Sequence, residues 1–165
     1  MTARAPELRI LVCGTADRGD DGAALAAISH VLPGLPDALR GRLEVRRCPQ
    51  LDVTDIMDIA DGVACVVVDT VIGVEPGSIV TMTLEDLARR PGGVGPRSSH
   101  ALSVDDALLI AEACRGSLPT GTFVGIGGKW FGYGARFSRA VKAGLPEFDV
   151  AIRHSIEELL ATLPV

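Results

Sequence analysis

The sequence predicts a three-layer αβα sandwich, with a mostly parallel, twisted five-stranded sheet and one antiparallel strand, in a single α/β domain over residues 1–165. Short continuous apolar runs, typical of strands buried on both faces, alternate with helix-like segments. This alternation is the pattern of parallel strands joined by crossover helices. One connection between strand-like runs, VIGVEPG, is too short for a crossover helix, so one strand is expected to be antiparallel.

Five segments are expected to form the strands. The first lies in the run LRILVC, around Ile10–Val12. The segment Arg42–Arg47 alternates apolar and polar residues, as a strand near a sheet edge does. The most apolar run, Val63–Val68, predicts a central strand. Ser78–Met82 is expected to be its antiparallel hairpin partner, and Thr122–Ile126 the last strand.

Helices and loops are expected between these strands. The expected helices cover residues 21–32, a segment capped by Asp52 or Thr54 that reaches Ile59, residues 84–89, 101–113 and 137–141, and a final helix that Pro146 starts. Pro36–Gly41 is expected to be a linker. Two glycine-rich loops, Arg90–Ser99 and Gly127–Gly134, are expected to be mobile and to border a binding groove.

Composition excludes several classes of function. The formal net charge of -5 and the lack of a basic stripe argue against a nucleic-acid partner. No apolar run is long enough to span a bilayer, and the first residues carry no apolar secretory segment, so a cytoplasmic monomer is expected. The four cysteines have no metal-site or redox spacing, and free thiols are expected.

Three polar positions are expected to meet at the carboxyl end of the sheet. Asp20 and Asp21 follow the first strand, Asp69 follows the central one, and His100 precedes a helix. Two carboxylates and an imidazole suit a divalent ion such as nickel or zinc. A purely structural interpretation also stands: the aspartates cap turns and helices, and the histidine caps or packs.

In this arrangement the chain resembles the hydrogenase maturation endopeptidases. The resemblance is carried by Gly14, by Asp20-Asp21-Gly22, by VVVD ending at Asp69 with EPG at 75–77, and by Ser98-Ser99-His100. It implies removal of a C-terminal peptide from the large-subunit precursor of a nickel–iron hydrogenase, after nickel insertion. By the same resemblance, Asp21, Asp69 and His100 bind the metal of the substrate. Zinc or cadmium could replace nickel there, and Asp20 and Asp21 are the candidate general bases.

The chain departs from that family in two loops. Where the family has GxGN, this chain has Gly14-Thr15-Ala16-Asp17, and the loop to the carboxylates looks two residues shorter. A glycine-rich stretch after the second strand is replaced by Cys48–Asp52. The alternative function is a non-catalytic, metal-dependent assembly scaffold or chaperone of the same fold. A nucleotide site is disfavoured, since both GxGxxG and the P-loop lysine are missing.

Overall fold

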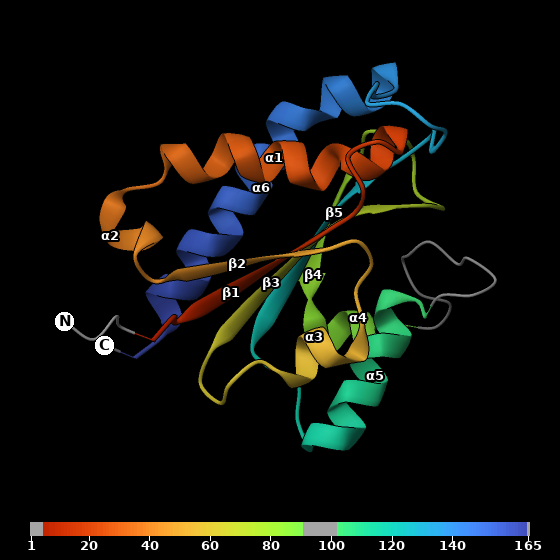
Figure 1. Ribbon diagram of the computed structural model, residues 1–165. Coiled ribbons are helices and arrows are strands. Elements are labelled where there is room, and N and C mark those ends of the chain that lie inside the picture. The colour runs from red at the N-terminus through yellow and green to blue at the C-terminus, as the bar shows by residue number, and fades with distance from the viewer. Residues whose placement is uncertain (1–4, 91–101, 165) are drawn as a thin grey trace.

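Five strands form one sheet in the order β2-β1-β3-β5-β4 (Figure 1). The computed structural model describes residues 5–90 and 102–164 of the chain. The first three strands of that order and β5 run parallel, whereas β4 is antiparallel to β5. The strands are β1 (Leu8–Cys13), β2 (Leu43–Cys48), β3 (Ala64–Val71), β4 (Ile79–Thr83) and β5 (Gly121–Gly127).

Helices cover both faces of this sheet. Figure 1 shows α1 and α6 on one side and α3, α4 and α5 on the other. The helices are α1 (Ala23–Val31), α2 (Asp37–Arg40), α3 (Val53–Met57), α4 (Leu84–Ala88), α5 (Val104–Arg115) and α6 (Arg139–Thr162). Two short 3-10 turns, η1 (Gly19–Gly22) and η2 (Leu32–Gly34), flank α1. The predicted fold class is thereby confirmed.

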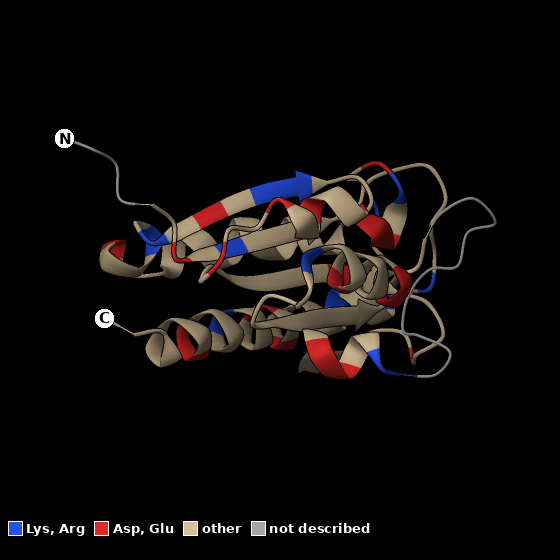
Figure 2. Ribbon diagram, turned by 90° about the horizontal axis from the view of Figure 1, so that it is seen from below, with Lys and Arg blue, Asp and Glu red and all other residues tan. Residues whose placement is uncertain are grey.

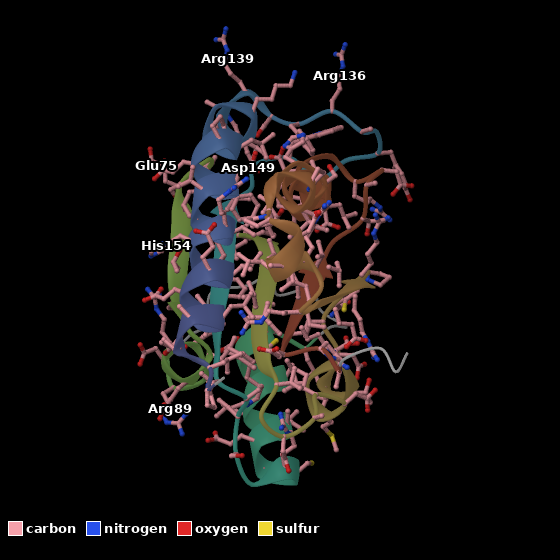
Figure 3. All side chains as sticks on the ribbon, turned by 90° about the vertical axis from the view of Figure 1, so that its left-hand side faces the viewer. Glu75, Arg89, Arg136, Arg139, Asp149 and His154 are labelled. Carbon is pink, nitrogen blue, oxygen red and sulfur yellow. The ribbon has the colours of Figure 1, made fainter. Side chains whose placement is uncertain are left out.

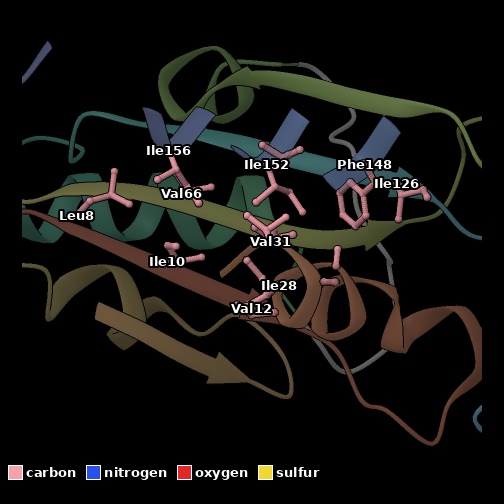
Figure 4. Close-up of a cluster of buried hydrophobic side chains, with 14 of the residues drawn as sticks. Leu8, Ile10, Val12, Ile28, Val31, Val66, Ile126, Phe148, Ile152 and Ile156 are labelled. Carbon is pink, nitrogen blue, oxygen red and sulfur yellow. The ribbon is translucent and has the colours of Figure 1, made fainter. Parts of the chain in front are cut away.

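Successive side chains of the central strands point to opposite faces of the sheet, so each face has its own hydrophobic core. In β1, Leu8, Ile10 and Val12 pack against α1 and α6, as Figure 4 shows, whereas Leu11 and Cys13 face the opposite helix layer. Every residue of β1 and β3 is buried. This burial on both faces is why these strands have continuous apolar sequences instead of alternating ones.

The antiparallel strand has the predicted direction but a different neighbour. β4 pairs with β5 at the edge of the sheet, and β5 lies between β4 and β3. The expected hairpin of β3 with β4 is therefore wrong. A short connection requires β4 to start at the end of the sheet where β3 stops, but it can still cross the width of one intervening strand.

Several expected helices and helix boundaries differ from the structure. The short helix expected over residues 137–141 is not separate, because residues 139–141 are the first turn of α6. Residues 36–41 were expected to be a linker, yet 37–40 form α2. α5 begins at Val104 instead of residue 101, because the Ser103 side chain accepts a hydrogen bond from the backbone N–H of Asp106. Pro146 lies inside α6 and does not start it. Ser138 caps the helix eight residues earlier, and the 24-residue helix accommodates the proline.

The surface carries both signs of charge. Figure 2 shows acidic and basic segments interspersed over strands, helices and loops. In that view, no face consists mainly of Lys and Arg. Among the helices of residues 5–90 and 102–164, none combines the length and the apolar character that crossing a membrane requires.

Candidate active site at the carboxyl ends of β1 and β3

A cleft of about 450 Å³ opens where β1 and β3 end. The residues that line it include Arg18, Asp21, Asp69, Ile72, Leu102 and Phe131. Asp21 follows β1 and Asp69 belongs to β3, so the structure brings these two predicted carboxylates to one cavity. Open α/β sheets bind their ligands at this end of their strands.

Asp21 is positioned by the tight turn between β1 and α1. One carboxylate oxygen, Oδ2, accepts a hydrogen bond from the backbone N–H of Thr15 at 2.8 Å. Gly14 makes this turn possible: its φ is 123°, and a Cβ at Gly14 would lie 2.0 Å from the carbonyl oxygen of Asp21. Among the described residues, none donates a hydrogen bond to Oδ1 of Asp21, which leaves that oxygen for a ligand in the cleft.

Asp69 lies inside β3, two residues before its end, and not directly after the strand as expected. Its neighbours Val67 and Val71 pack toward α3, α4 and α5, so Asp69 faces the same side of the sheet. Burial and, to a smaller extent, the nearby charge of Asp21 raise the pKa of this carboxyl, the Thr70 N–H at 2.8 Å opposes them, and the net result is a pKa of about 7. A pKa near 7 means that both the protonated and the ionised form of Asp69 are populated near neutral pH.

Asp20 is fully buried and points away from the cleft. Its Oδ2 accepts hydrogen bonds from the N–H groups of Lys129 and Trp130 at 2.8 and 2.9 Å and from the Ser138 hydroxyl at 2.8 Å. Its Oδ1 accepts one from the Ser138 N–H at 2.7 Å. Burial raises the pKa of Asp20, but these four hydrogen bonds outweigh burial and hold the pKa below its usual value.

The backbone of Asp20 reinforces this arrangement. Its N–H donates to the Trp130 carbonyl at 2.8 Å, and its carbonyl accepts from the Thr70 hydroxyl at 2.8 Å. We call Asp20 and its partners Lys129, Trp130 and Ser138 the Asp20 clasp. The clasp occupies the carboxylate oxygens that a general base would need, and Asp20 does not line the cleft, so in this structure the residue positions the loop. Its catalytic role stays a prediction.

The clasp also changes the expectation for the Gly127–Gly134 loop. Two consecutive backbone N–H groups of this loop are fixed on Asp20, and Phe131 directly after them lines the cleft. This part of the loop is anchored and is not a free lid. The other expected mobile loop lies, from residue 91 onward, outside the described residues.

His100, the third predicted ligand, also lies outside the described residues. The description resumes at Leu102, which lines the cleft. Within residues 5–90 and 102–164, no group of three His, Cys, Asp or Glu side chains is placed to hold a metal ion. The described part of the site thus offers Asp21 and Asp69, a pair of oxygen ligands suited to a divalent cation.

The sequence did not single out the pair of Arg18, which lines the cleft, and Tyr133, which contacts it. Arg18 lines the cleft, and the carbon of its guanidinium lies 4.3 Å from the centre of the Tyr133 ring. Its Nη2 donates to the Tyr133 hydroxyl at 3.3 Å. No pattern in the sequence links two residues 115 positions apart. The cluster of aromatics in the Gly127–Gly134 loop was the one available signal.

Comparisons with known proteins bear on this fold. No protein-family profile and no curated protein matches the sequence. The [NiFe] hydrogenase maturation protease HybD from Thermococcus kodakarensis is 24% identical, with a TM-score of 0.62 over 90% of this chain and 99% of that one. The hydrogenase maturating endopeptidase HybD from E. coli is 17% identical, with a TM-score of 0.71 over 92% and 93% of the two chains.

A third similar structure is the [NiFe] hydrogenase maturation protease HycI from Thermococcus kodakarensis. It is 18% identical, with a TM-score of 0.63 over 92% of each chain. At these identities the likeness shows a shared fold over nearly the whole length. The chain therefore has the fold of the hydrogenase maturation proteases, the family that its motifs resemble.

Proposed function

We propose that this chain is a metal-dependent endopeptidase that removes a C-terminal peptide from the large-subunit precursor of a nickel–iron hydrogenase, after nickel insertion. One observation carries the proposal: in a fold shared with maturation proteases, Asp21 and Asp69 line one cleft at the carboxyl ends of β1 and β3. The maturation proteases in the comparison give the class of reaction, and the carboxylate pair gives this chain a means of binding a cation.

In this proposal the metal is the nickel of the substrate. Asp21 and Asp69 bind it, with His100 as the third ligand, and zinc or cadmium could replace it. Such an ion supplies recognition and Lewis acidity toward a peptide carbonyl. A cation between the two carboxylates also offsets their mutual repulsion, which favours the ionised form of Asp69, whose pKa burial raises to about 7.

The other parts of the proposal concern partners and location. The precursor protein is the partner, and the enzyme acts as a cytoplasmic monomer that binds neither nucleic acid nor membrane. The mixed surface charges in Figure 2 and the net charge of -5 support the absence of a nucleic-acid partner.

The experiment is incubation with nickel-loaded large-subunit precursors, followed by intact-mass spectrometry. The wild type should shorten a precursor by one C-terminal peptide, and Asp21→Asn should leave its mass unchanged while melting within a few degrees of the wild type. Asp17→Asn is the matched control: this exposed aspartate lies in the same turn but does not line the cleft, so the variant should cleave normally. A precursor that binds tightly but keeps its mass would indicate the assembly scaffold instead.

A further inference from the structure

Arg18 is the one cationic residue among the described residues that line the cleft. It stands in a run of acidic residues, between Asp17 and the Asp20-Asp21 pair. Even so, Arg18 forms no ion pair with any carboxylate in the described part of the chain. Its guanidinium is stacked on Tyr133 instead. An arginine held away from its acidic neighbours keeps its charge available to a ligand.

Two independent sets of contacts hold Arg18 in place. The side chain is oriented by the exposed ring of Tyr133 and by the hydrogen bond to the Tyr133 hydroxyl. The backbone of Arg18 forms a parallel bridge with Gly134, and the N–H of Gly19 donates to the Gly134 carbonyl at 2.8 Å. The N–H of Gly134 in turn donates to the Asp17 carbonyl at 2.8 Å. The turn that carries Arg18 and the loop that carries Tyr133 are thus joined along both backbones.

Stacking defines which part of the guanidinium a ligand can reach. The guanidinium carbon lies over the ring of Tyr133, and one of the five N–H donors is used by the tyrosine hydroxyl, which leaves the others for a ligand. A planar edge with several parallel donors matches a carboxylate, which binds arginine through two hydrogen bonds. Ordering the side chain in advance lowers the entropic cost of such binding.

Arg18 is also close to the carboxylate pair. The N–H of Asp21 donates to the carbonyl of Arg18 at 3.2 Å, so both residues belong to the same turn. The cleft wall also includes the apolar side chains of Ile72 and Phe131. The cleft therefore combines a site for a cation, an apolar wall and a site for an anion within one short stretch of bound chain.

We propose that Arg18, oriented by Tyr133, is a specificity-determining residue that binds a carboxylate of the substrate peptide close to the scissile bond. The carboxylate comes from an acidic side chain or from a free C-terminus, because both present the same planar anion. That the ligand is a peptide rests on the proposed function. The anion site itself rests on the geometry of Arg18.

The first test reads Arg18 directly by the NMR signal of its side-chain Nε–H group, assigned with Arg18→Gln. Three probes are titrated: acetyl-Val-Ala-Ala with a free C-terminus, its C-terminal amide, and the amide with aspartate at the middle position. At least one of the acidic probes should shift the Arg18 signal, and the neutral amide should not. Which acidic probe acts identifies the source of the carboxylate. An equal response to all three probes, or none, would overturn the proposal.

Arg136→Gln is the matched control for these titrations. Arg136 is exposed, lies in the same β5–α6 connection, and projects away from the body of the protein in Figure 3. It does not line the cleft. Its replacement removes one positive charge and should leave the Arg18 response unchanged. Loss of the response in this variant would mean that the probes sense net charge alone, which contradicts a specific site at Arg18.

The second test is kinetic and uses a precursor that the wild type cleaves. Arg18→Gln should lower kcat/KM by about tenfold, mostly through KM, since one charge-assisted pair is lost. When the acidic group of the precursor is amidated or replaced, wild type and variant should become equal. Cleavage at the wild-type rate by Arg18→Gln would overturn the inference and leave the proposed function intact. Probe binding at Arg18 without cleavage of any precursor would support the anion site and contradict the proposed function.

Discussion

Replacing Asp20 by asparagine should destabilise the protein far more than the same change at Asp21. The carboxylate of Asp20 accepts four hydrogen bonds in a fully buried position. Asparagine removes the charge that strengthens them, and its NH₂ group must face a backbone or hydroxyl donor. If the amide oxygen of asparagine takes the place of Oδ2, its NH₂ group takes the place of Oδ1. In the wild type, Oδ1 accepts a hydrogen bond from the N–H of Ser138 at 2.7 Å. Two donors then face each other in a buried site.

The expected loss is about 3 kcal/mol, the scale of a charge-assisted hydrogen bond together with an unsatisfied buried donor. For a chain of this size, that corresponds to a fall in Tm of roughly 10 °C. Asp21→Asn should cost less than about 1 kcal/mol, since the amide oxygen can still accept the N–H of Thr15. Thermal unfolding measured by circular dichroism gives both values.

A second measurement locates the effect of the Asp20 change. In the wild type, the backbone amides of Lys129 and Trp130 should exchange hydrogen slowly, because both donate to the buried carboxylate. In Asp20→Asn they should exchange much faster, while amides in β1 and β3 change only as global stability requires. If the variant melts with the wild type and these two amides stay protected, the clasp does not hold the loop, and the role assigned to Asp20 is wrong.

Two further variants, and one control, test how the carboxylates are held. Without metal, Asp69 should make the free energy of unfolding fall as pH rises from about 4 to about 7, because the folded state binds its proton more tightly. The loss is at most about 4 kcal/mol, and chemical denaturation of Asp69→Asn should lack it. Gly14→Ala should cost more than about 3 kcal/mol through its clash with Asp21. Gly73→Ala, with positive φ but open space, should cost about 1 kcal/mol by the same denaturant titration.

The sequence predicted the sheet well because its central strands are buried on both faces. A run such as Val63–Val68 has few alternatives to a central strand, and the structure extends it as β3. The neighbour of β4 was not predictable on the same basis. The length of the connection after β3 determines the direction of β4, whereas its partner depends on where β5, much later in the chain, enters the sheet.

Helix ends were predicted less well, because local signals compete. Ser103 and Ser138 are ordinary capping residues, and each caps the helix that follows it. Two other residues gave wrong helix starts: the histidine three residues before Ser103, and Pro146, because proline is typical of the first turn of a helix. A proline well inside a helix is rare by itself, and the packing of the rest of α6 against the sheet offsets its cost.

The roles of Asp20 and Asp21 show where a single sequence stops being informative. Both residues suit a turn after β1, and nothing local decides which one faces the cleft. The decision is made by Ser138, 118 positions away, and by the loop before it, which take the side chain of Asp20. Thr70 faces the α1 and α6 side of β3 and does not line the cleft. Its hydroxyl donates a hydrogen bond to the carbonyl of Asp20.

The same contacts join the turn after β1 and the β5–α6 loop into one unit. The clasp joins Asp20 to the loop on one side of the turn, and Arg18 joins it to Tyr133 on the other. Asp21 lies directly beside both attachments. We therefore expect a change in the loop to shift Asp21, even though no loop residue contacts either carboxylate through a hydrogen bond in the described part of the chain. Under the proposed function, loop variants should therefore alter substrate preference and the placement of Asp21 together.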